Sequence, residues 1–223
     1  MKKICAILPS YNEGKNIAGV IKGVLRHKIN VVVVDDGSTD DTYRLAEESG
    51  VSVIRHAKKQ GKGAALKDGL DFAILHGYDY MIAMDADGQH SPEEIPLFIS
   101  EADKHEDAGI IIGNRLSNPE GMPATRLYTN QLMSQIVSSL CGQYIPDTQC
   151  GFKLIKKTAL ENINIKTRKF EIETELLVKA AKANFRIISV PITTIYAGEK
   201  SHINPFMDAL RFIKFTIGAI FKR

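Results

Sequence analysis

Short apolar runs alternate with helix-like segments over the first half of the chain, and no other feature restricts the possible folds as much. The runs that resemble buried strands are ICAIL, NVVVVDD, VSVIRH and YDYMIAMD. Between them lie the helix-like segments NIAGVIKGVLRH, TYRLAEESG and GAALKDGLDFAILHG. Such alternation is typical of right-handed βαβ units, because a helix must cross back over the sheet before the next parallel strand begins. We therefore predict an α/β fold with a mostly parallel central sheet flanked by helices.

The second half continues this pattern after one interruption. Beyond GIIIGNRL, a loop that contains Pro119 and Pro123 precedes a long helical stretch. A strand-like run (GFKLI), a helix-like segment (EIETELLVKAAKAN) and a further strand-like run (FRIISVPIT) follow. No repeat and no linker rich in proline and glycine divides the chain, whose 223 residues are 44% hydrophobic. We therefore expect a single domain over residues 1–223 with one substantial core.

The C-terminal segment 205–223 predicts an amphipathic helix. Its apolar residues recur at helical spacing, and its basic residues lie on another face. The apolar set is Phe206, Leu210, Ile213, Ile217 and Ile220, and the basic set is Arg211, Lys214 and Lys222. Such a helix can lie on an anionic membrane surface or pack its apolar stripe on the sheet, and the sequence leaves both open. No uncharged apolar run reaches the roughly 18 residues of a spanning helix, so we expect a soluble or peripheral protein.

Charge and cysteine content exclude further classes of protein. The net charge of +3 is too weak to imply a nucleic acid partner. The three cysteines lack the paired spacing of a zinc site, which favours a reduced, cytosolic chain. The apolar run at the N-terminus is too short for a signal peptide and reads as the first strand.

Two acidic turns follow strand-like runs. VVVVDDGSTDDT places Asp35 and Asp36 after one run, and MIAMDADGQH places Asp85 and Asp87 after another. In an open α/β sheet such turns lie at the carboxyl edge of the strands, where ligands bind. Two carboxylates this close would repel each other unless a cation joins them, and a hard divalent cation can do so when diphosphate oxygens complete its shell.

Helix capping is the alternative role for these aspartates. It is the preferred one for Asp40 and Asp41, which precede a helix-like segment. For Asp85 and Asp87 the cation interpretation is favoured, because Ser91, next to Pro92, can already supply the cap that the following helix needs.

A lysine between two glycines forms a candidate phosphate contact. Lys62 stands between Gly61 and Gly63 at the expected start of a helix. Glycine lets the backbone approach a ligand closely, and helix N-termini favour anions. The spacing of a P-loop is absent.

Taken in order, these motifs resemble the glycosyltransferases of family 2 with the GT-A fold, and among them the polyprenyl-phosphate sugar transferases that include dolichol-phosphate mannose synthases. The matching pieces, which span residues 7–192, are LPSYNEGKNI, VVDDGSTDDT, KGAAL, MDADGQHSPEEIP, IIGNR, DTQCGFKL and VPI. The resemblance implies a nucleotide-binding half at 1–113 and an acceptor-binding half at 114–204. It also implies inverting, metal-dependent transfer of a sugar from a GDP- or UDP-sugar to a polyprenyl phosphate.

The same resemblance assigns roles at the donor side. The base and ribose would contact Pro9, Tyr11, Glu13 and Asp36, and the diphosphate would contact Lys62. Asp85 would face the sugar or ribose, and Ala86 would also belong to the donor-binding residues. The chemistry agrees, because carboxylates accept from ring N–H and hydroxyl groups and a tyrosine ring offers a stacking face. Helix capping is the alternative for Glu13 and its neighbour Asn12.

The metal and the acceptor have their own expected ligands. Asp87 and Gln89 would bind Mg²⁺ or Mn²⁺, which would stabilise the departing nucleoside diphosphate. Arg115 and Arg126 would bind the acceptor phosphate, although Arg126 could equally be an exposed helix residue.

Asp147 is the expected base or acceptor-positioning residue. A phosphate monoester is already ionised near neutral pH, since its second pKa is about 6, and needs no strong base. An alternative acceptor, a saccharide hydroxyl, would depend on such a base. A sugar-nucleotide-binding module without turnover is a third reading.

The sequence departs from the family in IYAGEKSHINP. Relatives commonly carry an arginine ahead of Gly-x-Ser-Lys in this loop, and here Lys200, Ser201 and His202 stand without it. We expect Lys200 or His202 to substitute at the donor diphosphate. The resemblance also implies a cytoplasmic protein at the inner face of the membrane, where contact would come from the last helix or from a partner. A membrane-protein partner and a homo-oligomer are both left open.

Overall fold

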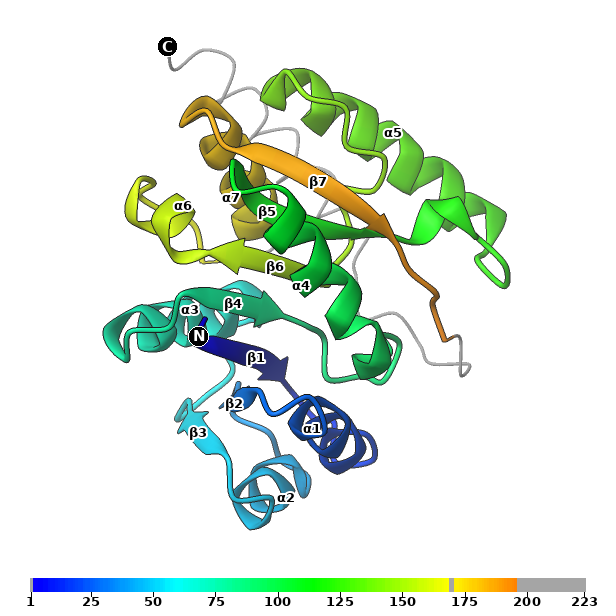
Figure 1. Ribbon diagram of the computed structural model, residues 1–223. Coiled ribbons are helices and arrows are strands. Elements are labelled where there is room, and N and C mark those ends of the chain that lie inside the picture. The colour runs from blue at the N-terminus through cyan, green and yellow to red at the C-terminus, as the bar shows by residue number, and fades with distance from the viewer. Residues whose placement is uncertain (1, 169–170, 196–223) are drawn as a thin grey trace.

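A central seven-stranded sheet organises the part of the chain that the computed structural model describes, residues 2–168 and 171–195 (Figure 1). Its strand order is β3-β2-β1-β4-β6-β5-β7. The strands are β1 (Ile4–Ser10), β2 (Asn30–Asp35), β3 (Ser52–Arg55), β4 (Tyr80–Ala83), β5 (Ala108–Asn114), β6 (Lys153–Lys156) and β7 (Arg186–Pro191). Most are buried on both faces, which explains their nearly continuous apolar sequences.

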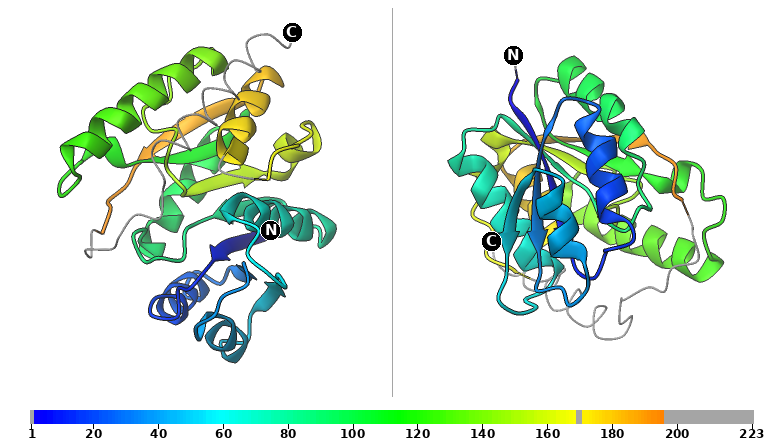
Figure 2. Two further views of the ribbon diagram at one scale, coloured as in Figure 1. Left: turned by 180° about the vertical axis from the view of Figure 1, so that it is seen from behind. Right: turned by 90° about the horizontal axis from the view of Figure 1, so that it is seen from below.

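Helices cover both faces of this sheet (Figure 2). They are α1 (Ile17–Leu25), α2 (Thr42–Glu48), α3 (Lys62–Leu75), α4 (Ile95–Lys104), α5 (Ala124–Cys141), α6 (Lys157–Glu161) and α7 (Glu171–Lys182), with short 3₁₀ turns η1 (Pro92–Glu94) and η2 (Arg115–Ser117). α1 and α2 pack together on one face, and α3 and α7 on the other. Gly69 of α3 lies so close to β1 that an added Cβ would stand 2.3 Å from Ile7, so only glycine permits this approach.

The direction of the strands brings distant loops to one edge. β1, β2, β3 and β4 pair in parallel, as do β5 and β7. β6 is antiparallel to both of its neighbours, and its first residue, Lys153, pairs with Ala83 and Ile112 near the ends of β4 and β5. The loop that enters β6 therefore meets the loops that leave the parallel strands.

The predicted α/β fold with a mostly parallel sheet is confirmed. The short helix α6 was not expected. The capping role expected of Ser91 is wrong: Ser91 precedes η1, but its side chain accepts no capping hydrogen bond, and only its carbonyl accepts from Glu94 N. Asp40 does bind the first turn of α2 through Thr42 N at 3.0 Å, as expected, whereas the side chain of Asp41 makes no cap.

The C-terminal helix expected at 205–223 lies outside the described residues, as do Lys200, Ser201 and His202. Among the residues that are described, no helix has the length and apolar character needed to cross a membrane.

Candidate functional site

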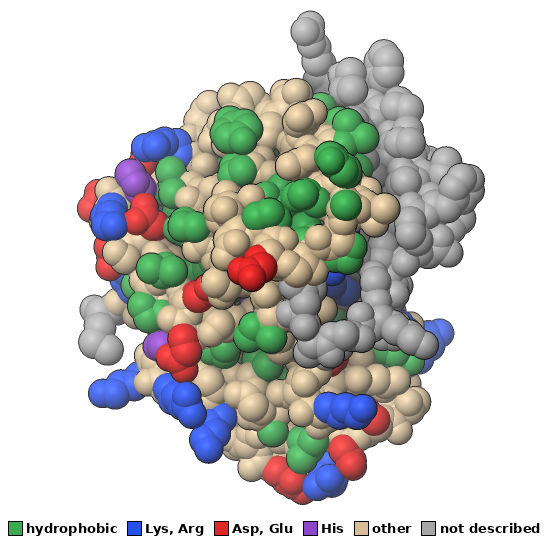
Figure 3. All heavy atoms as spheres, turned by 90° about the vertical axis from the view of Figure 1, so that its right-hand side faces the viewer, with side chains coloured by type: hydrophobic (Ala, Val, Ile, Leu, Met, Phe, Trp, Pro, Cys, Tyr) green, Lys and Arg blue, Asp and Glu red, His purple; other side chains and the backbone are tan. Residues whose placement is uncertain are grey.

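The site lies at the edge of the sheet where the parallel strands end. Figure 3 looks onto this edge, where acidic and basic side chains lie side by side in the lower part of the view and hydrophobic side chains gather above them. The turns after β1, β2, β4 and β5 and the loop before β6 meet here. Parallel strand pairing thus brings together most of the residues expected from sequence.

A lysine bridges two carboxylates at the centre of this edge. The Nζ of Lys62, in the first turn of α3, lies 2.7 Å from Asp85 Oδ1 and 3.1 Å from Glu173 Oε1 of α7. The other oxygen of Glu173 accepts from Lys153 Nζ at 2.5 Å, and the same ammonium donates to the Cys150 carbonyl. Lys153 is buried, so its ammonium holds Glu173 from the side of the core.

These charges determine one another's ionisation. Burial alone would lower the pKa of Lys62, but the carboxylates of Asp85 and Glu173 outweigh it and raise that pKa above its ordinary value. Burial would raise the pKa of Asp85, and Lys62 and His90 reverse this, so that the pKa lies below the usual range. Burial would also raise the pKa of Glu173, and Lys153 and Lys62 lower it below its ordinary value. Lys62, Asp85 and Glu173 are therefore all charged at neutral pH, in an arrangement that a bound cation or anion would perturb strongly.

Asp85 is held in place by the backbone at Gly151 and by the imidazole of His90. A Cβ at Gly151 would stand 2.5 Å from Asp85 Oδ2, so the carboxylate rests against bare backbone. His90 Nε2 lies 4.0 Å from the same oxygen, and the imidazole packs against Phe152. Burial lowers the pKa of His90 to about 4, which keeps the ring neutral near pH 7. Asp85 is thus oriented by packing and remains 28% exposed toward the edge.

The turn after Asp85 fits a divalent cation only in part. Asp87 and Gln89 are half-buried, and Asp87 Oδ1 accepts from Gln89 N at 3.0 Å. Within residues 2–168 and 171–195, no group of three or more His, Cys, Asp or Glu side chains could enclose a metal ion. Carboxylate and amide oxygens suit Mg²⁺ or Mn²⁺, but such an ion would need further oxygens from a ligand. That donor diphosphate completes the shell stays a prediction.

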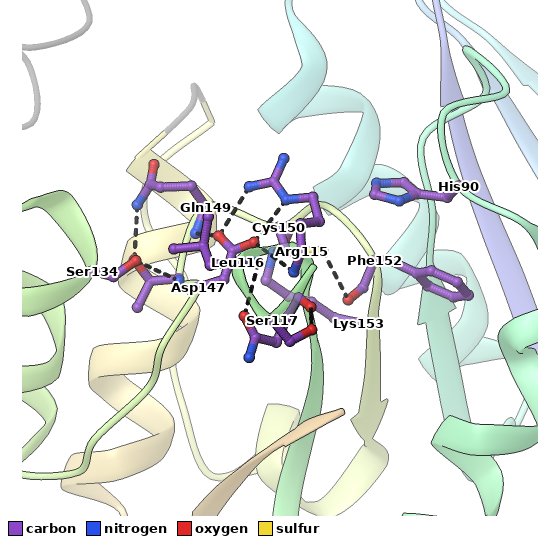
Figure 4. A network of polar contacts seen from close by, with 12 residues as sticks. His90, Arg115, Leu116, Ser117, Ser134, Asp147, Gln149, Cys150, Phe152 and Lys153 are labelled. Carbon is purple, nitrogen blue, oxygen red and sulfur yellow. Dashed lines mark hydrogen bonds and ion pairs between the residues drawn. The ribbon is translucent and has the colours of Figure 1, made fainter. Parts of the chain in front are cut away.

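Arg115 and Asp147 form a buried ion pair (Figure 4). Arg115 Nε donates to Asp147 Oδ2 at 2.7 Å, Nη2 donates to Oδ1 at 2.9 Å, and the backbone N of Arg115 also reaches Oδ2. Asp147 is 0% exposed. A proton on this carboxylate would leave a buried guanidinium without its counter-charge, which disfavours a role as base. The pair joins the end of β5 to the loop before β6.

The expected donor residues also meet at this edge, but their side chains already have partners. Asp36 accepts from Gln60 N and Gly61 N, each at 2.7 Å, and from His56 Nδ1 at 2.7 Å. It therefore fixes the loop that leads to Lys62. Lys59 Nζ lies 3.5 Å from the centroid of the Tyr11 ring, in a cation–π contact with the ring that is expected to stack on a base.

The remaining expected residues are placed as follows. Pro9 is half-buried in β1 opposite Val34, and Glu13 accepts from the side chain of Asn16 at 3.2 Å rather than capping α1. Ala86 is buried in the core, so only its backbone can meet a ligand. Arg126 lies in the first turn of α5, which begins on the side where the strands end.

Glu173, Lys153 and His56 were not expected from sequence. Glu173 lies in EIETELL, a pattern that predicts an exposed glutamate on the solvated face of a helix. Lys153 gives a stronger signal, because a lysine inside the apolar strand GFKLI requires a buried partner. His56 directly follows β3 and lies between two carboxylates, with Nδ1 2.7 Å from Asp36 and Nε2 3.0 Å from Asp68.

Several known proteins resemble this chain in sequence or in fold. Residues 5–163 match the family model described as glycosyl transferase family 2. A UDP-N-acetylglucosamine–dolichyl-phosphate N-acetylglucosaminyltransferase from Methanococcus voltae is 33% identical and covers 87% of this chain and 86% of its own. A polyprenol monophosphomannose synthase from Mycolicibacterium smegmatis is 30% identical over 86% of this chain and 77% of its own.

A solved structure supports the fold. Glucosyl-3-phosphoglycerate synthase from Mycobacterium tuberculosis, crystallised with Mn²⁺, uridine diphosphate and phosphoglyceric acid, superposes with a TM-score of 0.74. The match covers 98% of this chain and 77% of the other, at 19% sequence identity.

Proposed function

Because the chain belongs to glycosyl transferase family 2, and is therefore a glycosyltransferase, we propose that it transfers a sugar from a nucleotide diphosphate donor to a polyprenyl phosphate. Family membership sets aside the alternative of a binding module without turnover. The relatives named above are similar over most of their length, and their names include dolichyl phosphate and polyprenol monophosphomannose.

The observation that carries the choice of acceptor is the Arg115–Asp147 ion pair. Asp147 is the carboxylate expected to deprotonate a hydroxyl acceptor, yet it is buried and bound through both oxygens to Arg115. A phosphate monoester has lost its second proton near neutral pH, with a pKa of about 6, and attacks without a base. This favours polyprenyl phosphate over a saccharide hydroxyl.

The donor would lie along the edge formed by β1, β2 and β4. Tyr11 would stack on the base, Glu13 and Asp36 would accept from base or ribose, and Lys62 would contact the diphosphate. Asp87 and Gln89 would hold Mg²⁺ or Mn²⁺, which as a Lewis acid would stabilise the charge on the leaving nucleoside diphosphate. Asp85, braced by Gly151, would orient the sugar for displacement with inversion.

Arg115 and Arg126 are proposed to face the acceptor. Arg115 would hold the loop before β6 in place through Asp147, and Arg126, at the start of α5, would meet the phosphate. A lipid acceptor implies peripheral contact with a membrane, which we propose to be its cytoplasmic face. The segments 196–204 and 205–223 would contribute Lys200, Ser201 and His202 and an amphipathic helix.

The test is turnover with polyprenyl phosphate against a panel of GDP- and UDP-sugars, with and without Mg²⁺ or Mn²⁺. Thermal stabilisation by each nucleotide identifies the donor first, because a ligand that binds only the folded state raises its apparent stability. We expect metal-dependent nucleotide release that rises with pH near the second phosphate pKa of about 6. Release only with a saccharide acceptor would refute the proposal.

A further inference from the structure

Lys62 lies between two carboxylates that are themselves held in place, so it is the group able to move. Glu173 is anchored by the buried Lys153, and Asp85 rests on the backbone at Gly151. Lys62 is a long side chain, 31% exposed, at the start of α3. The residue before it, Gly61, has φ 105°, a conformation that side chains rarely adopt.

We propose that Lys62 is a charge toggle: in the donor-free protein its ammonium neutralises Asp85 and competes with the cation at the Asp85–Asp87 turn, and the donor draws it onto Glu173 and the diphosphate. This inference rests on the metal and donor site of the proposed function. Glu173 is accordingly a positioning residue. Its Oε1, 3.1 Å from Lys62 Nζ, is the second partner that holds the ammonium once Asp85 is released.

The toggle has a functional consequence in the order of binding. An ammonium 2.7 Å from Asp85 offsets the negative charge that would attract a divalent cation. Metal alone would therefore bind weakly. Metal that arrives with a diphosphate would bind well, because the diphosphate supplies both oxygens for the metal and a new partner for Lys62. The site would thus be occupied only when donor is present.

The experiment measures free Mn²⁺ by electron paramagnetic resonance in titrations of the full-length chain, without nucleotide and with UDP or GDP. Lys62→Met should bind Mn²⁺ about tenfold more tightly without nucleotide, because it removes a positive charge beside the site. The same variant should bind the nucleotide more weakly. Glu173→Gln should weaken Mn²⁺ binding without nucleotide, because Lys62 then remains on Asp85.

A double-mutant cycle separates the toggle from simple through-space charge effects. If Glu173 acts through Lys62, Glu173→Gln should change Mn²⁺ affinity little in the Lys62→Met background. If the two substitutions change Mn²⁺ affinity additively, the toggle is refuted. Lys67→Met is the matched control, because it removes a lysine from the same helix together with its ion pair to Asp71, and it should leave Mn²⁺ affinity unchanged.

Two further outcomes would be decisive even if Glu173→Gln does not fold. If folded Lys62→Met binds Mn²⁺ without nucleotide as weakly as the wild-type protein does, the toggle is refuted and the proposed function is left intact. Wild-type protein that binds no Mn²⁺ with either UDP or GDP would overturn the metal site, and the toggle with it.

Discussion

Replacing Asp147 with asparagine should separate a structural role of this residue from a chemical one. The wild-type carboxylate is 0% exposed and accepts three hydrogen bonds from Arg115, whose own side chain is 6% exposed. Asparagine keeps one oxygen but removes the charge and the second acceptor. Breaking a buried ion pair by removing one partner costs roughly 3–5 kcal/mol, since the other charge stays buried and uncompensated.

The expected signature is a large loss of stability with modest loss of turnover. A domain of about 150–250 residues loses roughly 2–4 °C in melting temperature per kcal/mol, so Asp147→Asn should melt about 10 °C lower. Activity is then compared well below that melting temperature, with polyprenyl phosphate as acceptor. We expect most of the wild-type turnover to remain, because an ionised phosphate acceptor has no proton that a base must remove.

Two results would contradict this reasoning. An unchanged melting temperature would mean that the ion pair contributes nothing to stability. Loss of turnover by about 10²- to 10⁴-fold in folded protein with intact donor affinity would show that Asp147 is a base, which would favour a hydroxyl acceptor. As a stability control, replacing both partners by apolar residues, Arg115→Met with Asp147→Leu, should recover most of the lost stability.

Three other substitutions test separate parts of the structure. Asp87→Asn should nearly abolish turnover and weaken metal-dependent nucleotide binding in calorimetry, because it removes a charged oxygen from a hard cation; unchanged affinity would count against this residue as a ligand. Gly151→Ala should lower turnover at least about tenfold, because a Cβ at this position would stand 2.5 Å from Asp85 Oδ2 and would push the carboxylate off the backbone that supports it; unchanged turnover would show that this support does not matter. Glu175→Gln should destabilise the fold at pH 7 by about 1–3 kcal/mol, because Glu175 accepts hydrogen bonds from Thr167 and Lys166 and pairs with Lys179. Burial would raise the pKa of Glu175, but these partners hold it below the ordinary 4.5, so its contribution is present above that pH and is lost as the pH falls further. Chemical denaturation of both proteins should therefore show the gap closing below pH 4.5, and a constant gap would refute the assignment.

Features encoded locally were predictable from the sequence. The ends of β2 at Asp35 and of β4 at Ala83 are visible in the sequence to within one residue, because an apolar run gives way to aspartates and glycines. Parallel pairing then brings those turns together, so the clustering of Asp36, Asp85 and Lys62 at one edge needed no knowledge of tertiary contacts.

Features that depend on pairing across the fold were not predictable. Glu173 meets Lys62 and Lys153 only because α7 packs on α3 and β6 runs antiparallel to its neighbours. Neither arrangement can be predicted from local sequence patterns. Asp147 was expected as a base or acceptor-positioning residue and Arg115 as a ligand of the acceptor phosphate, and the structure instead pairs the two side chains with each other. The bidentate geometry follows from the register of β5 against β6, which periodicity does not reveal.

The reversed strand β6 also dictates when the sheet can be completed during synthesis. β4, finished at Ala83, pairs on one side with β1, but its other neighbour is β6, which begins at Lys153. β5 emerges from the ribosome first and cannot take that place, since its partners are β6 and β7. At translation rates of about 5–20 residues per second, the hydrogen-bonding edge of β4 stays open for several seconds. Nascent chains that stall between these strands should therefore be the ones most dependent on chaperones, because an unpaired, apolar strand edge is a template for aggregation.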